Sequence, residues 1–498
     1  MTIVTRFAPS PTWYLHIGSL RTVLYNYLYT KQHDGKFMLR IEDTDRTRFV
    51  EGSAENLQEV LASVGLIPDE WPNNPGQNWP YFQSQRLDIY HNYIEKLLAS
   101  WHAYYCFCTS ERLQELRDQQ QELWLPTKYD KKCRYLSPEE IEKNIQAKIP
   151  YTIRLAVPEW KTISFYDTIR GKISVASKDI DDQVLIKADG FPTYHFAVVV
   201  DDYLMGVTDI IRGDEWIPST PKHILLYEAF WWQAPRYSHV PPLVGHNKKK
   251  LSKRTWDVSV DIFLQDGYIP EAILNYIALL GWNPKTTEEI FSLSELIQRF
   301  KLEDIHKSGA VFDIDRLEWF NSRYISSYDI ATLEDKLITY LRRYNPDLLE
   351  KLEYFSQDFK RKILSEIQTR LKKFSQYEEL THFFYNEKED IDTTLFINHK
   401  MKIDNLEQVM ENLKFSYDIL NNDTYNFDTI EDIKQIFIQE ISKAGKKNWQ
   451  VLWPVRIALS WEMFSPWALE LIYIFGKEKT LQKIHKSLKV LWYYDTII

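Results

Sequence analysis

The stretch Arg6-Phe-Ala-Pro-Ser-Pro-Thr-Trp-Tyr-Leu-His-Ile-Gly-Ser19 decides the fold. It leaves a β-rich run at residues 3–7 and enters a segment, residues 19–32, whose leucines and tyrosines recur at helical spacing behind the capping residue Ser19. A second β-rich run follows at residues 36–41. This strand–helix–strand order predicts the beginning of a parallel α/β sheet.

The rest of the sheet is expected much later in the chain, where apolar runs at residues 196–200 and 209–212 predict two more strands. Beyond residue 325 the apolar spacing is helical. We therefore predict an α/β fold in which a Rossmann-like parallel sheet carries an inserted domain and is followed by an all-α C-terminal region. The expected domains are, in chain order, residues 1–75, 76–185, 186–250, 251–325 and 326–498.

Composition is typical of a soluble protein with several domains. The 498 residues are 44% apolar and 26% charged, with a formal net charge of −9, and the length suits roughly three domains. An acidic total disfavours a generic nucleic-acid-binding surface but leaves room for a local basic groove. The chain starts without a leader-like apolar core, no run reaches about 18 apolar residues, and three cysteines are too few for a disulfide framework. We therefore expect a cytoplasmic protein that does not enter a membrane.

Two segments far apart in the chain suit the binding of a triphosphate. In the first, backbone N–H groups at a helix N-terminus attract phosphate, His16 can donate to a phosphate oxygen, and Gly18 lets the backbone approach a ligand. The second is Lys250-Leu-Ser-Lys-Arg254, whose cations can follow the charge that develops on a triphosphate. Either segment alone is more often a structural loop or a solvated basic face. Together they predict ATP binding with attack on the α-phosphate.

With these segments the chain resembles the class I aminoacyl-tRNA synthetases, in which residues 16–19 correspond to the HIGH-type motif and residues 250–254 to the KMSKS-type motif. The helical C-terminal part, with residues 452–459, resembles the bacterial glutamyl type, since glutaminyl relatives have β-barrels there. Further segments are similar to signatures of the glutamyl-tRNA synthetase family, in that family's order: residues 6–12, 40–46, 192–194, 211–216, 219–223, 275–282 and 319–321.

This resemblance implies a reaction and its partners. ATP with Mg²⁺ would activate L-glutamate to glutamyl-adenylate, and the glutamyl group would pass to the 3′-terminal adenosine of tRNA(Glu), first to its 2′-hydroxyl. The inserted domain would hold the acceptor end, residues 251–325 would carry the KMSKS-type loop and contact the tRNA stem, and residues 326–498 would read the anticodon. A monomer is expected. The sequence leaves open whether tRNA(Gln) is also charged.

The resemblance also implies the residues of the site, and substrate chemistry agrees with it. Glutamate has two carboxylates, which suit Arg6 and Arg212, and one ammonium, which suits Glu42. The implied glutamate-binding residues are Arg6, Ala8, Ser10, Glu42, Tyr194, His195 and Arg212. The implied ATP-binding residues are His16, Gly18, Glu215, Lys253 and Arg254. The implied catalytic residues are His16, Gly18, Ser19, Lys250, Ser252 and Lys253.

A candidate zinc site lies in the expected insert. Cys106, Cys108 and Cys133, with Tyr129, resemble a zinc-binding insertion of some family members, and thiolates two residues apart can chelate one tetrahedral ion. Tyr135 stands where some relatives have histidine, so Tyr129 is the better candidate for the fourth ligand. The alternative is three small buried residues, as cysteine often is.

Tryptophan and glycine are used unusually. The chain has 17 tryptophans and 15 glycines, where the average glycine content of about 7% would give roughly 35. Many tryptophans lie in turns, which often need a positive φ, and that conformation strains a bulky residue by about 1–3 kcal/mol. Eleven stand where the resembled pattern has glycine: Trp13, Trp71, Trp79, Trp101, Trp124, Trp160, Trp231, Trp256, Trp449, Trp461 and Trp467.

We hypothesise that one codon, UGA, was translated as tryptophan although the source organism reads it as glycine. Exchanging the eleven residues would leave 26 glycines and 6 tryptophans. If Trp13 is genuine, the chain would instead be a non-catalytic tRNA-binding paralogue, because a large ring would stand directly before the loop at His16. A relative that glutamylates a modified tRNA base is a further alternative, but that type lacks a long anticodon-binding part.

Overall fold

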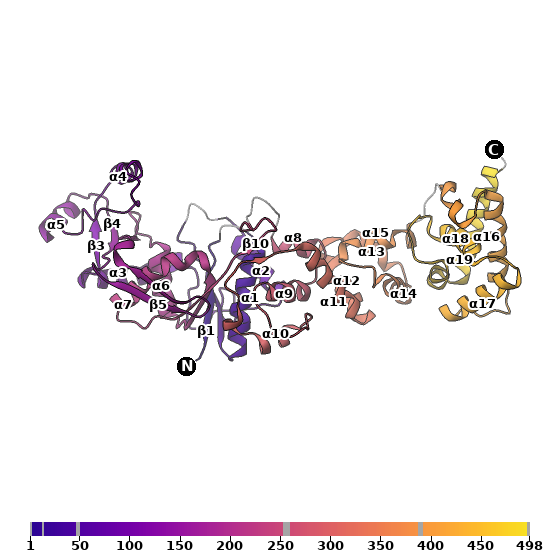
Figure 1. Cartoon of the computed structure of the whole chain (residues 1–498), viewed down its shortest axis with the longest axis horizontal. Coiled ribbons are helices and arrows are strands. Elements are labelled where there is room, and N and C mark those ends of the chain that lie inside the picture. Colours follow the sequence, from indigo (N-terminus) through magenta and orange to yellow (C-terminus); the bar gives the residue numbers. More distant parts are fainter. Residues whose placement is uncertain (1, 12–13, 46–49, 252–258, 387–391, 496–498) are drawn as a thin grey trace. The chain divides into compact units, whose positions relative to one another are not determined.

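The computed structural model describes residues 2–11, 14–45, 50–251, 259–386 and 392–495 (Figure 1). The chain forms two compact units, one of residues 1–264 with 270–317 and one of residues 265–269 with 318–498. Each unit has a buried apolar core of its own.

The elements of the N-terminal part follow in a mixed order. The strands are β1 (Val4–Phe7), β2 (Lys36–Leu39), β3 (Ala103–Cys106), β4 (Thr152–Leu155), β5 (Thr162–Asp167), β6 (Gly171–Ala176), β7 (Val184–Ile186), β8 (Asp209–Gly213), β9 (Arg236–Val240), β10 (Leu243–Val244) and β11 (Ala310–Val311). The α-helices are α1 (Ile17–Gln32), α2 (Ser53–Ser63), α3 (Leu87–Ala99), α4 (Ser110–Glu122), α5 (Pro138–Gln146), α6 (Tyr194–Leu204), α7 (Thr220–Ala229), α8 (Val260–Gln265), α9 (Pro270–Leu279) and α10 (Leu293–Arg299).

A parallel sheet forms the centre of the first unit. β1 pairs with β2 and β8 pairs with β9, both in parallel register. The N–H of Thr208, directly before β8, donates to the carbonyl of Val4 at 3.0 Å and so joins the two pairs. β5 extends the sheet parallel to β9, and β6 pairs antiparallel with β5, which gives the order β2-β1-β8-β9-β5-β6. The predicted Rossmann-like parallel sheet is confirmed.

Two local predictions are wrong. Residues 196–200 form part of helix α6 rather than a strand. Because every side chain from residue 196 to 202 is buried, the apolar run lacks the periodicity that separates a buried helix from a buried strand. Helix α1 begins at Ile17 and not at Ser19, and its N-cap is His16, whose ring nitrogen Nδ1 accepts the N–H of Gly18 at 2.9 Å.

A second, antiparallel sheet with the order β3-β4-β7 lies within the expected insert, except for Ile186 at the end of β7. The small buried cluster of Tyr104, Cys106, Tyr129 and Cys133 packs beside it. The β5–β6 hairpin belongs to the same stretch of sequence, yet β5 pairs with β9 of the central sheet. The expected insert is therefore hydrogen-bonded directly to the strands that carry the loops of the site.

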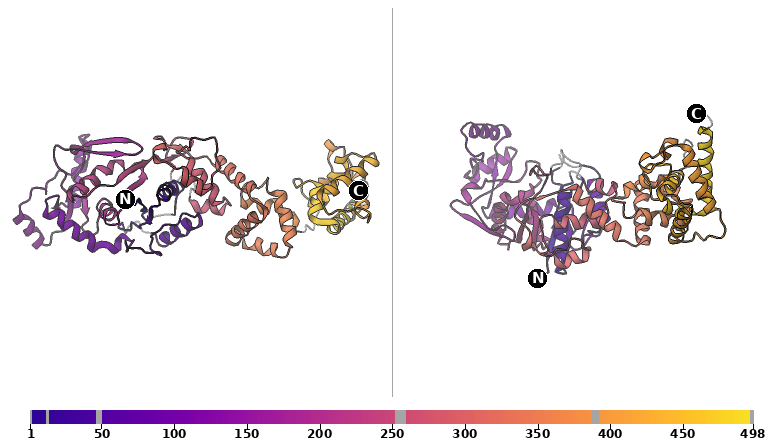
Figure 2. Two further views of the ribbon diagram at one scale, coloured as in Figure 1. Left: turned by 90° about the horizontal axis from the view of Figure 1, so that it is seen from below. Right: turned by 45° about the vertical axis from the view of Figure 1, so that its right-hand side comes forward.

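The regular elements described after residue 311 are all helices, drawn in orange to yellow in Figures 1 and 2. Their core includes Val409, Ile433, Val455 and Leu471. No described helix is both long enough and apolar enough to span a membrane. The helices are α11 (Ile314–Ser327), α12 (Ile330–Tyr344), α13 (Pro346–Glu353), α14 (Gln357–Ile367), α15 (Tyr377–Thr381), α16 (Leu406–Leu420), α17 (Ile430–Lys443), α18 (Asn448–Ser460) and α19 (Ala468–Asp495).

Among the described residues other than glycine, a positive φ occurs at five tryptophans, five lysines and one aspartate. The five tryptophans are Trp101 (58°), Trp124 (54°), Trp160 (59°), Trp231 (59°) and Trp461 (52°). All five belong to the set that stands at expected glycine positions. Four other described members of that set, Trp71, Trp79, Trp449 and Trp467, are not among the residues with positive φ, and neither are the six remaining tryptophans. Trp13 and Trp256 lie outside the described residues.

Candidate active site

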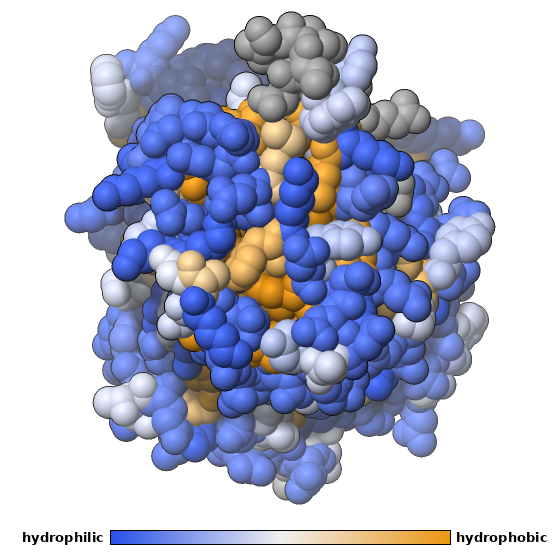
Figure 3. Space-filling view, turned by 90° about the vertical axis from the view of Figure 1, so that its right-hand side faces the viewer, coloured by the Kyte–Doolittle hydropathy of each residue, from blue (hydrophilic) through white to orange (hydrophobic). Residues whose placement is uncertain are grey.

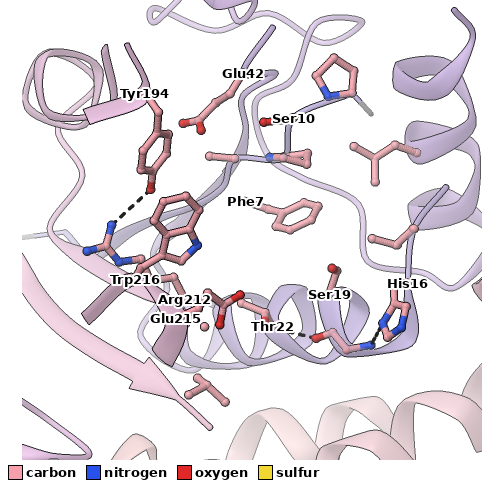
Figure 4. A pocket seen from close by; sticks show the side chains of 18 of the residues that line it. Phe7, Ser10, His16, Ser19, Thr22, Glu42, Tyr194, Arg212, Glu215 and Trp216 are labelled. Atoms are coloured by element: carbon pink, nitrogen blue, oxygen red, sulfur yellow. Dashed lines mark hydrogen bonds between the residues drawn. The ribbon is translucent and has the colours of Figure 1, made fainter. Parts of the chain in front are cut away.

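The site is a cavity of ≈ 980 Å³ in the first unit, at the carboxyl ends of the parallel strands. Loops after β1, β2, β8 and β9 and the first turns of α1 and α6 line it. Ligands of open α/β sheets bind at this edge, where the connections to the two halves of the sheet separate. In Figure 4, Glu42, Tyr194 and Arg212 lie on one side of the cavity, and His16 and Ser19 on the other.

The structure brings together most of the residues implied by the sequence. The cavity is lined by Arg6, Ala8, Ser10, His16, Gly18, Ser19, Glu42, Tyr194, Arg212, Glu215 and Lys250. His195 does not line it, and its ring contacts that of His223, with 3.2 Å between Nδ1 and Nε2. Burial, with Lys222 and Arg212 nearby, lowers the pKa of His195 to about 4. Ser252, Lys253 and Arg254 lie outside the described residues.

The start of helix α1 has the chemistry of a phosphate site. Because Nδ1 of His16 accepts the N–H of Gly18, the neutral ring carries its proton on Nε2, which is a donor. A Cβ on Gly18 would lie 3.2 Å from that Nδ1, so glycine lets the ring approach the amide. Across the cavity edge, Lys250 lies 3.4 Å from a carboxylate oxygen of Glu215. Donors at the start of α1 and the cation Lys250 therefore line the same cavity.

Arg212 presents a buried positive charge to the cavity. Its Nε donates to Nε2 of His239 at 3.1 Å, Nη2 donates to Oγ1 of Thr220 at 2.9 Å, and Nη1 donates to the hydroxyl of Tyr194 at 3.3 Å. These partners fix the guanidinium without neutralising it, since burial lowers the pKa of His239 and keeps that ring uncharged. No carboxylate of the described residues forms an ion pair with Arg212. The arginine is suited to a carboxylate supplied by a ligand.

Arg6, by contrast, already has a carboxylate partner. Asp202 lies 3.0 Å from Nε of Arg6 and 2.8 Å from Nη1 of Arg40. Burial would raise the pKa of Asp202, but the two guanidinium groups hold it below its ordinary value. Asp202 was missed by the sequence analysis. Two adjacent carboxylates in an apolar run, Asp201 and Asp202, are the signal that could have found it, because buried carboxylates need buried cations.

Glu42 is held on the same network. One oxygen of its carboxylate accepts from Nη2 of Arg40 at 3.0 Å, and the side chain is buried. Burial raises the pKa of Glu42 to about 7, although Arg40 and Arg6 oppose the shift. A carboxylate that is costly to ionise gains most from a new cation, such as an ammonium group.

Comparison with known proteins decides the family. Residues 2–319 match the model described as tRNA synthetases class I (E and Q), catalytic domain, and residues 333–488 match an anticodon binding domain. The chain is 45% identical over 485 residues to a glutamate–tRNA ligase of Clostridium tetani, covering 97% of this chain and 96% of the relative. It belongs to the glutamate–tRNA ligase family of class I aminoacyl-tRNA synthetases.

Other members of the glutamate–tRNA ligase family agree in sequence and in structure. A ligase of Clostridioides difficile is 44% identical over 499 residues, covering 97% of this chain and 98% of the relative. The crystal structure of a glutamate tRNA ligase from Elizabethkingia meningosepticum, in complex with its amino acid, superposes with a TM-score of 0.85 at 33% identity, covering 99% of this chain and 100% of that one. The family, fold class and ligase activity predicted from the motifs are confirmed, and with them the use of ATP and Mg²⁺.

The cysteine cluster of this family member is compact. The Sγ atoms of Cys106, Cys108 and Cys133 all lie within 4.8 Å of one another. The hydroxyl of Tyr129 lies 3.3 Å from Cys106 and 3.4 Å from Cys108. Hydrogen bonds, first from Cys133 and then from Tyr129, lower the pKa of the Cys106 thiol to about 4. Tyr135 is exposed, and its hydroxyl donates to Glu159 at 3.4 Å.

A second cavity, of ≈ 480 Å³, lies in the C-terminal unit within the part that matches the anticodon binding domain. It is lined by the start of α17, by α18 and by the start of α19. The guanidinium of Arg456 stacks on the ring of Trp453, 4.3 Å from its centroid. Trp449 and Trp467, two of the tryptophans at expected glycine positions, also line it. Figure 3 shows a face of the molecule on which apolar side chains are exposed among hydrophilic ones.

Proposed function

We propose that the 980 Å³ cavity binds L-glutamate and ATP and that it catalyses formation of glutamyl-adenylate. The observation that carries the proposal is Arg212, a buried guanidinium held only by uncharged groups among the described residues. Arg212 would bind one carboxylate of glutamate and Arg6 would contact the other. Glu42 would bind the ammonium, and Ala8, Ser10 and Tyr194 would complete the pocket. His195 does not line the cavity and would support the pocket indirectly, through its ring contact with His223.

ATP would bind on the opposite side, at the start of α1. His16, Gly18 and Ser19 would hold the phosphates, Glu215 would contact the nucleoside, and Lys250 would approach the triphosphate from the second loop. Ser252, Lys253 and Arg254 complete that proposal from the sequence. An α-carboxylate oxygen of glutamate attacks the α-phosphorus and the bond to the pyrophosphate oxygen breaks. The protein contributes mainly orientation and charge stabilisation to this step.

The second step transfers the glutamyl group to tRNA. The 2′-hydroxyl of the 3′-terminal adenosine attacks the acyl carbon, AMP leaves, and the hydroxyl proton is released. We propose residues 76–185 as the insert that holds the acceptor end and residues 251–325 as the part that contacts the stem. Residues 326–498 would read the anticodon, with the 480 Å³ cavity as the binding place of a base. A cytoplasmic monomer specific for tRNA(Glu) is the simplest form of the proposal, and charging of tRNA(Gln) is a question for the assay.

The cysteine cluster fits a structural zinc ion. Cys106, Cys108 and Cys133 would supply three sulfur ligands and Tyr129 the fourth, since three thiols within 4.8 Å match the donors that tetrahedral zinc prefers. The ion would hold the turn after β3 against the segment around Cys133. It would take no part in the ligase reaction.

Pyrophosphate exchange tests the proposal. The purified chain and a Trp13→Gly variant are each assayed for glutamate-dependent exchange between pyrophosphate and ATP, with tRNA(Glu), with tRNA(Gln) and without tRNA. We expect exchange with glutamate in at least one of the two proteins and its loss in Arg212→Gln. Activity only in the Trp13→Gly variant would support the codon hypothesis. Tight tRNA binding with no exchange in either protein would favour the non-catalytic paralogue.

A further inference from the structure

A buried chain of hydrogen bonds runs from Arg212 through His239 to Asp167. Nε of Arg212 donates to Nε2 of His239 at 3.1 Å, and Nδ1 of His239 lies 2.7 Å from Oδ2 of Asp167. The side chains of His239 and Asp167 are fully buried. The three residues lie near the carboxyl ends of β8, β9 and β5, which are neighbours in the sheet. The chain of bonds therefore crosses from the pocket into the hairpin of the expected insert.

The protonation of this chain of bonds follows from its surroundings. Burial lowers the pKa of His239, and Asp167 only partly offsets this, so the ring is neutral at pH 7. Burial opposes ionisation of Asp167, but hydrogen bonds from His239 and from the N–H groups of Arg170 and Ile169 hold its pKa below the ordinary value. Since a carboxylate can only accept, the His239 proton lies on Nδ1, which leaves Nε2 as the acceptor for Arg212.

We propose that Asp167 and His239 are positioning residues for Arg212. Asp167 fixes the tautomer and the orientation of the His239 ring, and the ring fixes the Nε edge of the guanidinium so that its Nη edge stays in the pocket. The carboxylate in this chain of bonds contacts His239 and not Arg212, so the arginine keeps its charge for the ligand. This inference rests on the proposed role of Arg212 in binding a carboxylate of glutamate.

Two variants of His239 separate positioning from packing. In His239→Gln the amide oxygen reaches towards the place of Nε2 and can still accept from Arg212. In His239→Asn the shorter amide reaches the place of Nδ1 and can still donate to Asp167, but the acceptor for Arg212 is lost. We expect His239→Asn to raise the KM for glutamate in pyrophosphate exchange roughly 10- to 100-fold, the effect of losing one hydrogen bond to a charged group. We expect His239→Gln to retain most of the affinity, with the KM for ATP unchanged in both.

The controls distinguish this inference from the role of Arg212 itself. Tyr166→Phe, next to Asp167 but exposed, should leave both KM values unchanged. If Arg212→Gln leaves the KM for glutamate unchanged, the proposed function of Arg212 fails. If Arg212→Gln abolishes exchange but His239→Asn and His239→Gln raise the KM for glutamate equally, or neither raises it, the positioning role alone is overturned.

A different observation concerns the ends of three helices. At Trp101, Trp124 and Trp231 the tryptophan N–H bonds the carbonyl three residues back, and the next N–H bonds the carbonyl five residues back. The same pair of bonds closes α2 at Gly65, α6 at Gly206 and α17 at Gly445. In this helix-ending motif the residue with positive φ is usually glycine. The same motif thus closes three helices at glycine and three at tryptophan, and it also closes α1 at Asp34 and α5 at Lys148.

The tryptophan side chains give no reason for their positions. Trp101 is 75% exposed, Trp124 94% and Trp231 92%, and Trp160, with a φ of 59° in the turn before β5, is 95% exposed. An indole is normally kept for the large apolar area that it buries. Trp282, outside this set, is buried to 2% exposure and has no positive φ.

We infer that the natural protein has glycine at residues 101, 124, 160 and 231. The codon at these positions, translated here as tryptophan, would be read as glycine by the source organism. In the gene, these four positions should share one codon, UGA, while Trp216 and Trp282 should have UGG. Peptide mass spectrometry of the protein isolated from its own organism should find glycine at all four positions. Tryptophan in those peptides, or the same UGG codon in both groups, would overturn the inference.

Discussion

Replacing Trp101, Trp124 and Trp231 together by glycine is expected to stabilise the first unit of the chain as printed. Left-handed backbone costs a residue with a side chain about 1–2 kcal/mol. Relief of this strain is partly offset, because the unfolded chain is more flexible with glycine, which costs about 0.5–1 kcal/mol on folding. The net gain is then about 0.5–1 kcal/mol at each site. Since the three indoles are mainly exposed, little burial is lost with them.

The three sites close different helices and share none of their motif bonds, so their effects should add to roughly 2 kcal/mol. Urea unfolding followed by far-ultraviolet circular dichroism measures the difference between the printed chain and the triple variant. Gly206→Trp is the matched reverse change, because nothing lies within 4 Å of the Cβ that it would add, and it should cost about 0.5–1 kcal/mol. A triple variant no more stable than the printed chain would refute the argument from backbone strain.

Four further predictions concern Glu42, Asp202 and the cysteine cluster. Because burial raises the pKa of Glu42 to about 7, the KM for glutamate should fall as the pH rises through that value, and Glu42→Gln should remove this dependence. Between pH 4.5 and 7 the folded state keeps the proton of Glu42, while the unfolded state has released it. The contribution of Glu42 to the free energy of unfolding therefore falls as the pH rises through this range. Urea unfolding of the unchanged chain and of Glu42→Gln at both pH values should show this fall only in the unchanged chain. Asp202→Asn should lower the free energy of unfolding by about 3–5 kcal/mol, since Arg6 and Arg40 lose their shared carboxylate; an unchanged urea midpoint would contradict this. Metal analysis should find one zinc per chain in the purified protein and none in Cys133→Ser, whereas a metal-free native chain would disprove the zinc proposal.

Local motifs pointed to residues that line the cavity, but not to the residues behind them that hold Arg212 in place. His16, Glu42 and Arg212 could be proposed together, and the structure places all three in the lining of one cavity, because each lies in a short segment with its own recognisable pattern. His239 and Asp167 lie 27 and 45 residues from Arg212 in the chain, and only the order of strands brings them together. The run at residues 196–200 was misread for a related reason: a helix buried on all sides has no polar face to show its period.

The two arginines of the cavity differ in what balances them, and this difference assigns them different work in the proposed site. Asp202 pairs with both Arg6 and Arg40, and Asp201 lies 3.7 Å from Arg40. Two carboxylates therefore balance these two cations, and the group adds little net field to the pocket. No carboxylate of the described residues pairs with Arg212. The carboxylate of Asp167 bonds to His239, and only the neutral ring of His239 contacts Arg212. A buried cation in that state is costly until an anion arrives. The attraction for a substrate carboxylate should therefore come mainly from Arg212, while Arg6, already paired with Asp202, would add less to the binding of the second carboxylate.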